Sequence, residues 1–154
     1  SNMGGSAKDL YEDGVKLSFE QWGAGSATAY LADNTSTEKN YVDPISEYGG
    51  DVSAVSNITI KWDDSATDEQ KMERLITQKW IAMFPNGQEG WSEIRRTGYP
   101  KVFPLAQSTD YSIQVANRIP FDIDEATNNK ANYIKAVQLL KGNDDYATKM
   151  WWQR

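Results

Sequence analysis

Two carboxylates that could work as an acid and a base, Glu89 and Glu93, flank Trp91 near the middle of the chain. A glycosidase needs two carboxyl groups at a fixed separation, one of them with a raised pKa. Residues i and i+4 of a helix are about 6 Å apart, so a retaining geometry is not excluded. Glycosidases place their two acids on separate elements, however, and Glu89 has the spacing to cap a helix with Asn86. We therefore expect no hydrolysis from this pair and keep it as the least favoured alternative.

The chain contains no histidine and no cysteine. This composition excludes disulfides and thiolate metal sites, and it removes the commonest general base and metal ligand. Most hydrolase mechanisms thereby lose a central group. We expect a protein that is not an enzyme and that has no cofactor.

Aspartates are the remaining candidates for a metal site. Asp122–Asp124 opens like a calcium loop, but Thr127 stands where a glycine is needed and Tyr133 where a bidentate glutamate is needed. The pairs Asp63-Asp64 and Asp144-Asp145 could hold a hard cation, yet each lies beside an expected helix end in a polar loop. We expect them to be solvated and predict no metal site.

The overall charge argues against a nucleic-acid partner. The 154 residues carry a net charge of -6, with a pI near 4.7, and the adjacent Arg95 and Arg96 are explained by a helix end. The mean hydropathy is -0.68, and no apolar run is long enough to span a bilayer. The length fits one domain over residues 1–154, with residues 1–6 as a flexible lead whose Ser1-Asn2 resembles a cloning remnant.

A helical hairpin is predicted at the centre of the chain. Thr67 and Gln70 form a capping box at the start of a helix over Thr67–Phe84. A second helix is expected over Gln88–Thr97, ended by Gly98. The apolar residues of the first helix recur three and four apart, which leaves Glu73, Arg74 and Lys79 on its flanks; they are Met72, Leu75, Ile76, Trp80, Met83 and Phe84.

Trp80, Trp91 and Arg95 of this hairpin could form a sugar platform, but packing between the two helices, with Arg95 at the C-terminal cap, is the favoured interpretation.

Further elements are expected on both sides of the hairpin. Helical periodicity and caps predict helices over Ala7–Trp22, from Ser26 through Ala32, and over Asn129–Leu140, with Gly142 as the residue that ends the last one. Trp22 is expected in the core or between helices. Alternation predicts short strands over Asn57–Trp62 and Tyr111–Val115, which could pair. The expected fold class is mainly α with a few short strands.

The long polar stretch from Asp33 to Asp64 has the composition of a loop. Its aromatic residues Tyr41, Tyr48 and Trp62 could stack on a sugar ring or pin the loop to the core. We favour pinning, and these three residues are the candidates for glycan contact.

Four separated stretches resemble one family in the same order. They are YEDGVKLSFEQWG from Tyr11, KWIAMFPNGQEGWSEIRRTGYPKVFP from Lys79, NRIPFDIDEATNN from Asn117 and GNDDYATKMWWQR from Gly142. The second run resembles the signature near the C-terminus of the SusD-like (SusD/RagB) proteins. These are outer-membrane lipoproteins of Bacteroidetes that capture glycans for a TonB-dependent transporter.

The resemblance implies a SusD-like fold with tetratricopeptide-like helical hairpins and long loops. It also implies non-catalytic glycan capture for nutrient uptake and polysaccharide utilisation, with a glycan or oligosaccharide and a SusC-like transporter as partners. The chain would be the C-terminal part of a longer lipoprotein on the outer surface of the outer membrane, held to the membrane only by a lipid anchor. The alternative from another class is a scaffold module that binds protein.

The aromatic content is high for the expected core, with six tryptophans, eight tyrosines and four phenylalanines. Adjacent indoles expose a large apolar area, so the tail at Met150, Trp151 and Trp152 is expected to be buried against something. We expect either self-association or an exposed patch formed by Tyr11 and Trp22 of the first helix together with Trp151 and Trp152.

Overall fold

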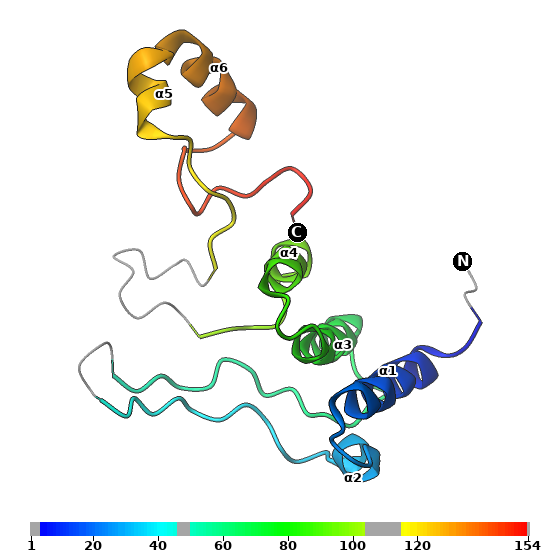
Figure 1. Cartoon of the computed structure of the whole chain (residues 1–154). Coiled ribbons are helices and arrows are strands. Elements are labelled where there is room, and N and C mark those ends of the chain that lie inside the picture. Colours follow the sequence, from blue (N-terminus) through cyan, green and yellow to red (C-terminus); the bar gives the residue numbers. More distant parts are fainter. Residues whose placement is uncertain (1–3, 46–49, 104–114, 154) are drawn as a thin grey trace.

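The computed structural model describes residues 4–45, 50–103 and 115–153, and these are mainly helical. Six helices occur in the described part (Figure 1): α1 (Ala7–Trp22), α2 (Thr28–Ala32), α3 (Asp68–Ala82), α4 (Gly87–Thr97), α5 (Ile123–Asn128) and α6 (Lys130–Leu140). The expected mainly α class is confirmed. None of the described helices is long and apolar enough to cross a membrane.

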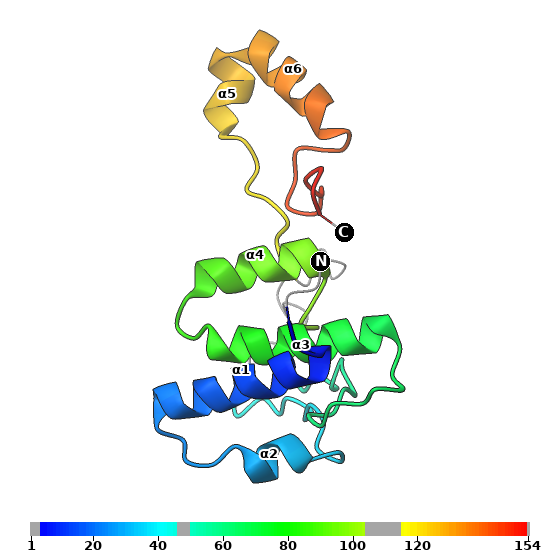
Figure 2. The ribbon, with the colours of Figure 1, turned by 90° about the vertical axis from the view of Figure 1, so that its right-hand side faces the viewer.

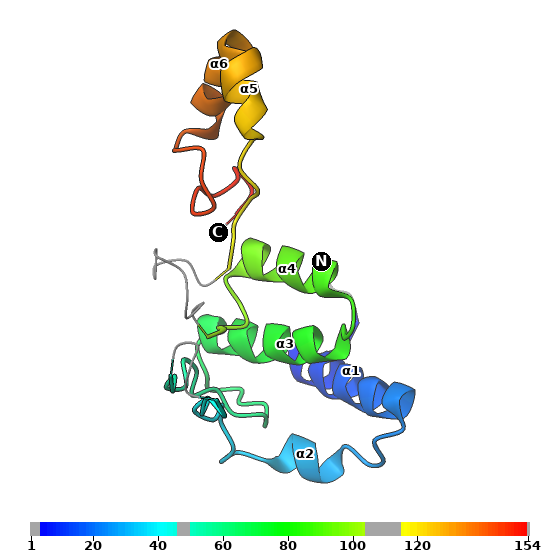
Figure 3. The ribbon, with the colours of Figure 1, turned by 60° about the vertical axis from the view of Figure 1, so that its left-hand side comes forward.

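The helices form two groups. α1, α3 and α4 lie side by side, with α2 beyond α1 at one end of the stack (Figures 2 and 3). The hairpin of α5 and α6 stands apart from them, on two connecting segments that run along the C-terminal side of α4. The tail at the C-terminus lies beside α4, on the opposite side of the α3–α4 pair from α1.

Side-chain caps set the starts of the long helices. Ser6 and Asp9 form a capping box at α1, and Thr67 and Gln70 form the one expected at α3. Asn86 accepts a hydrogen bond from the Glu89 amide at the start of α4. These bonds satisfy amide groups that have no partner within their own helix, which is why polar residues at this spacing predicted the boundaries well.

The core lies where α1 meets the loop that precedes α3. Tyr11, Val15, Ala27 and Trp62 are buried together, and three partly buried residues pack on them: Phe19, Tyr30 and Leu31. The ring centres of Tyr11 and Trp62 are 5.3 Å apart. The Trp62 indole donates a hydrogen bond to Asp64 at 2.8 Å, which satisfies its polar atom at the edge of the core.

The expected placement of the charged residues of α3 was wrong. Glu73 and Arg74 are buried along with Ile76, whereas Met72, Leu75 and Trp80 are exposed. The buried face of α3 packs on the loop before it, and that loop offers polar groups. Arg74 donates to the Thr59 carbonyl at 2.9 Å and to the Thr59 hydroxyl at 3.3 Å. The spacing of apolar residues in a helix cannot indicate that the segment packed against it is polar.

The expected strand over Asn57–Trp62 was also wrong. Residues 33–45 and 50–67 run side by side as long extended segments, with one β-bridge between Tyr41 and Val52 in the described part. Side chains supply hydrogen bonds that a strand ladder would otherwise make: the Tyr11 hydroxyl donates to the Ile60 carbonyl, and Arg74 donates to the adjacent carbonyl of Thr59. The second expected strand, Tyr111–Val115, lies largely outside the described residues.

Several helix boundaries differ from expectation by one or two residues, and one helix was not expected. The short helix begins after Ala27, which gives it no side-chain cap, while the Ser26 hydroxyl accepts from the Thr28 amide. α5 was not predicted; Asp122 caps it, so the acidic run that resembled a calcium loop is a helix start. α6 ends at Leu140, as expected, but the left-handed residue that follows it is Lys141 and not the expected Gly142.

A buried ion pair ties the base of the α5–α6 hairpin to the chain that leads into it. Arg118 and Asp144 are both almost fully buried and form a short charged hydrogen bond. Asp144 also accepts from the Phe121 amide and the Tyr133 hydroxyl, each at 3.1 Å. The expectation that this aspartate is solvated was therefore wrong.

The tail is partly docked. The Arg95 guanidinium lies 4.0 Å from the Trp91 ring centre and 4.6 Å from that of Trp152, so the tail stacks on α4 through this arginine. Trp151 is 92% exposed, which contradicts the expected burial of both tail indoles. Trp22 is half-exposed and contacts Phe84, with ring centres 6.2 Å apart, so it lies between helices and not in the core.

The expected patch of α1 and tail aromatics does not form. Tyr11 is buried, and α1 and the tail lie on opposite sides of the α3–α4 pair. Apolar surface is nevertheless abundant. The accessible surface is 10889 Å², whereas a compact monomer of 17.4 kDa exposes about 7,900 Å². In this arrangement several apolar faces, which a compact domain would bury, are exposed.

Candidate ligand-binding site

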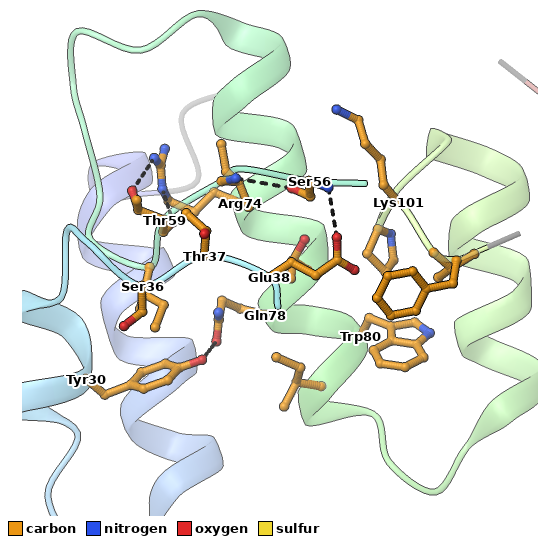
Figure 4. Close-up of a pocket in the computed structure, with 17 residues that line it drawn as sticks. Tyr30, Ser36, Thr37, Glu38, Ser56, Thr59, Arg74, Gln78, Trp80 and Lys101 are labelled. Carbon is orange, nitrogen blue, oxygen red and sulfur yellow. Dashed lines mark hydrogen bonds between the residues drawn. The ribbon is translucent and has the colours of Figure 1, made fainter. Parts of the chain in front are cut away.

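A cavity of about 430 Å³ opens between α3 and the two extended segments (Figure 4). We call it the Glu38 cavity. Eight of its 17 lining residues are apolar or aromatic, and nine have polar side chains. The residues that matter below are Tyr30, Glu38, Arg74, Gln78, Trp80, Lys101 and Phe103. A concave site in which polar groups converge beside apolar and aromatic side chains is typical of a small-molecule site.

Glu38 lies in the middle of the cavity, with its carboxylate directed toward the side of Trp80 (Figure 4). One carboxylate oxygen accepts two backbone amides, Val55 at 2.7 Å and Ser56 at 2.8 Å. These bonds arise because residue 38 and residues 55–56 are neighbours on the paired extended segments. They fix the orientation of the carboxylate without occupying its second oxygen.

Trp80 forms one side of the cavity and is 44% exposed. Its indole edge lies over α4 at Gly90, where a Cβ would be 3.1 Å from the indole Nε1. A side chain at position 90 would therefore require the indole to shift by a few tenths of an ångström. Gly90 is buried in this helix contact and gives Trp80 its place at the cavity edge.

Phe103 extends the aromatic wall. Its ring centre is 6.2 Å from that of Tyr41, which is half-exposed and belongs to the β-bridge with Val52. The segment after α4 and the tip of the paired segments thus meet through these two rings. This contact brings Tyr41 next to the cavity, although it is not itself part of the wall.

The polar groups of the remaining wall are mostly occupied by protein partners. Gln78 accepts a hydrogen bond from the Tyr30 hydroxyl at 3.0 Å. Lys101 is 3.4 Å from the buried carboxylate of Glu73, which also accepts from the Ser56 hydroxyl at 2.6 Å. A buried carboxylate needs such partners, so Lys101 is held by Glu73.

Arg74 lies on the side of the cavity away from Trp80 (Figure 4). Its Nε and one terminal nitrogen donate to Thr59, and the other terminal nitrogen, Nη1, is buried without a hydrogen-bond partner in the described part. Because Nη1 is not accessible to water, it is not accessible to a ligand in the cavity either.

The carboxylate pair considered for hydrolysis lies on α4, where both carboxylates are near Lys79 of α3, and neither lines the Glu38 cavity. Glu93 is buried between Lys79 at 2.9 Å and Arg96 at 2.7 Å. The hydrogen bond from Arg96, together with Lys79, outweighs the effect of burial and lowers the pKa of Glu93. A general acid in a glycosidase needs the opposite shift. The described residues contain no cluster of three or more acidic side chains that could hold a metal ion.

The three predicted glycan-contact residues have different positions. Trp62 is buried in the core against Tyr11, as expected of a residue that pins the loop. Tyr41 is exposed beside Phe103, and Tyr48 lies outside the described residues. Sequence reasoning did not consider Glu38, because its position opposite residues 55–56 follows from the pairing of two segments without strand periodicity.

A comparison with models of protein families shows to which family this chain belongs. A family model described as SusD-like, the Susd and RagB outer membrane lipoproteins, matches residues 1–153. The chain belongs to the SusD-like family. This confirms the resemblance carried by the four separated stretches. A comparison with curated proteins finds no match.

Solved structures of other SusD-like proteins share the fold of this SusD-like chain. A chitin-binding SusD homolog from Flavobacterium johnsoniae is 44% identical, with a TM-score of 0.83, over 98% of this chain and 32% of that one. A SusD-like protein from Bacteroides thetaiotaomicron is 46% identical (TM-score 0.84, 99% and 33% covered). A SusD homolog from Bacteroides uniformis is 44% identical (TM-score 0.85, 99% and 33% covered). The chain spans about a third of the length of these relatives.

Proposed function

We propose that this protein takes part in non-catalytic capture of glycans at the bacterial cell surface and in passing oligosaccharide to a SusC-like TonB-dependent transporter. The observation that carries the proposal is its membership of the SusD-like family over residues 1–153. The likeness to a chitin-binding homolog at 44% identity supports a glycan as the ligand. The Glu38 cavity offers what sugar binding needs, an aromatic wall and a fixed hydrogen-bond acceptor.

Binding without turnover is favoured by the state of the acidic residues. The pair Glu89 and Glu93 sits on one helix, and Glu93 is held ionised between two cations. Glycoside hydrolysis needs a carboxylic acid that stays protonated near neutral pH, opposite a second carboxylate on the far side of the bond. The chain also has no histidine to replace it as a general acid.

We also propose that the chain acts as the C-terminal part of a longer lipoprotein, held at the outer surface of the outer membrane by a lipid anchor. It spans about a third of its relatives, and its accessible surface is well above that of a compact monomer of its mass. The remaining two thirds of such a lipoprotein would cover exposed apolar side chains away from the Glu38 cavity, such as Leu17 of α1 and Leu75 of α3.

Isothermal titration calorimetry against a panel of neutral and acidic oligosaccharides tests glycan capture, and a reducing-end assay on the same panel tests the absence of turnover. We expect binding to at least one glycan and no new reducing ends. Failure to bind any glycan, either as this chain or within its full-length lipoprotein, would favour the scaffold alternative. Turnover that is lost in Glu89→Gln or Glu93→Gln would favour the hydrolase.

A further inference from the structure

We propose that the Glu38 cavity holds one uncharged sugar ring and selects neutral glycans over acidic ones. This rests on the glycan capture proposed above and adds the chemical class of the ligand and the residues that contact it. The cavity volume of about 430 Å³ lies within the range of small-molecule sites.

Glu38 supplies the polar contact. Its one oxygen is occupied by the amides of Val55 and Ser56, and its other oxygen accepts no hydrogen bond from the part of the chain that the structure describes. A carboxylate accepts hydrogen bonds and cannot donate them, and sugar hydroxyls are donors. Hydrogen bonds to an ionised acceptor are stronger than neutral ones. Because the amides already fix the carboxylate, little ordering is left for the ligand to impose.

Trp80 and Phe103 supply the apolar contact. Both line the cavity that Glu38 enters, and Trp80 is half-exposed. A pyranose ring has an apolar face of C–H groups and hydroxyls around its edge. Stacking that face on an aromatic wall leaves the edge hydroxyls free to reach Glu38.

The charges around the cavity favour a neutral ring. The cation of Lys101 is held by the buried Glu73, and the free nitrogen of Arg74 is closed to solvent. Lys101 is itself 42% exposed, but Glu38 is the carboxylate of the cavity that has no ion-pair partner among the described residues. A uronate or sulfate would meet a like charge there, and drawing Lys101 away would leave Glu73 with one partner fewer.

The ligand class is tested by calorimetry on the whole chain at low salt. The probes are cello-, malto- and chito-oligosaccharides, an oligogalacturonide, and the carboxyl-reduced, neutral form of that oligogalacturonide. We expect binding among the neutral probes, and binding of the acidic form at least about tenfold weaker than its reduced counterpart. Equal or tighter binding of the acidic form would overturn the proposal. Binding of no glycan, neither by this chain nor by its full-length lipoprotein, would overturn glycan capture together with it.

Variants test the cavity itself. Trp80→Ala should weaken binding of the neutral ligand about tenfold or more, and Trp80→Phe should keep most of it. Trp22→Ala is the matched control, since Trp22 is a similarly exposed tryptophan on another helix. Glu38→Gln should weaken neutral binding and narrow the gap between the neutral and acidic forms, whereas Glu20→Gln on the exposed face of α1 should do neither.

Circular dichroism would show that each variant keeps its helices. A wild-type chain that binds a neutral glycan, with Trp80→Ala and Glu38→Gln variants that bind it equally well, would place the ligand elsewhere. Glycan capture would then stand and the assignment of this cavity would fall.

Discussion

The hydroxyl of Tyr11 on α1 donates a hydrogen bond to the carbonyl of Ile60 at 2.6 Å. Both groups are at the edge of the core, and Ile60 belongs to an extended segment that has no strand partner over this stretch. One tyrosine thus supplies the bond that a neighbouring strand would otherwise make. Its ring packs on Trp62 two residues further along the same segment.

Tyr11→Phe should lower the free energy of unfolding by about 1–3 kcal/mol, because it keeps the ring and leaves the Ile60 carbonyl without its donor. Urea denaturation followed by circular dichroism measures the change. Tyr146→Phe is the control, since Tyr146 is exposed and no change beyond about 0.5 kcal/mol is expected there. Equal effects of the two variants would show that the Tyr11 hydroxyl contributes nothing specific.

The same residue predicts a response to alkaline pH. Burial, with a smaller contribution from Tyr30, raises the pKa of the Tyr11 phenol far above its usual range. A pKa raised in the folded state contributes stability below the unfolded pKa, and this is lost as pH rises through the folded value. The stability gap between wild type and Tyr11→Phe should therefore narrow above about pH 10. Urea curves at a series of pH values check this, and a constant gap would contradict it.

The helix boundaries could be predicted because they depend on neighbours in sequence. Ser6 with Asp9 and Thr67 with Gln70 close their hydrogen bonds within one turn, whatever the rest of the chain does. Burial in α3 could not be predicted, because the partner of Arg74 is Thr59, in an irregular segment 15 residues away. Apolar spacing predicts an apolar neighbour, and here Arg74 meets the carbonyl and the hydroxyl of Thr59.

The candidate site was missed for the same reason. Trp80 could be noticed as an aromatic side chain of the hairpin, yet Glu38 becomes a candidate only once residues 55 and 56 lie opposite it. No periodicity marks that pairing, because side chains and not a strand ladder hold it. Tyr41 could be selected as an exposed aromatic of the loop, but its neighbour Phe103 is 62 residues away in sequence.

Gly90→Ala should have separate effects on the stability of α4 and on the position of the Trp80 ring. Alanine favours a helix interior by about 1 kcal/mol over glycine, but a Cβ at this position would push the Trp80 indole away from α4. We expect thermal stability to change little and the affinity for a neutral glycan to fall. Gly14→Ala in α1 is the matched control, since nothing lies within 4 Å of its Cβ, and it should raise stability by about 1 kcal/mol. Unchanged glycan affinity in Gly90→Ala would contradict the role of the ring position.

Asp144→Asn should release the α5–α6 hairpin. It removes the charge that pairs with the buried Arg118, and breaking such a pair destabilises by about 3 kcal/mol. Hydrogen exchange should show lost protection in α6 with α1 unaffected. Asp13→Asn provides the comparison, because its pair with Lys16 is exposed and contributes below about 1 kcal/mol. Loss of protection in α1 as well would show that the hairpin and the core unfold together.

The hydrogen bond between Tyr11 and Ile60 joins residues that are distant in sequence, and this predicts an order of events during folding. It joins residues 49 apart, and closing a loop of that length opposes folding by about 3 kcal/mol before any core contact forms. The α3–α4 and α5–α6 hairpins need no such closure, because each is joined by a few residues. They should be protected early in pulse-labelled exchange, and α1 should join last, when the intervening loop has been drawn across α3. Slow steps in refolding would then belong to the segment that also builds the Glu38 cavity, so the cavity would be the last feature of the molecule to appear.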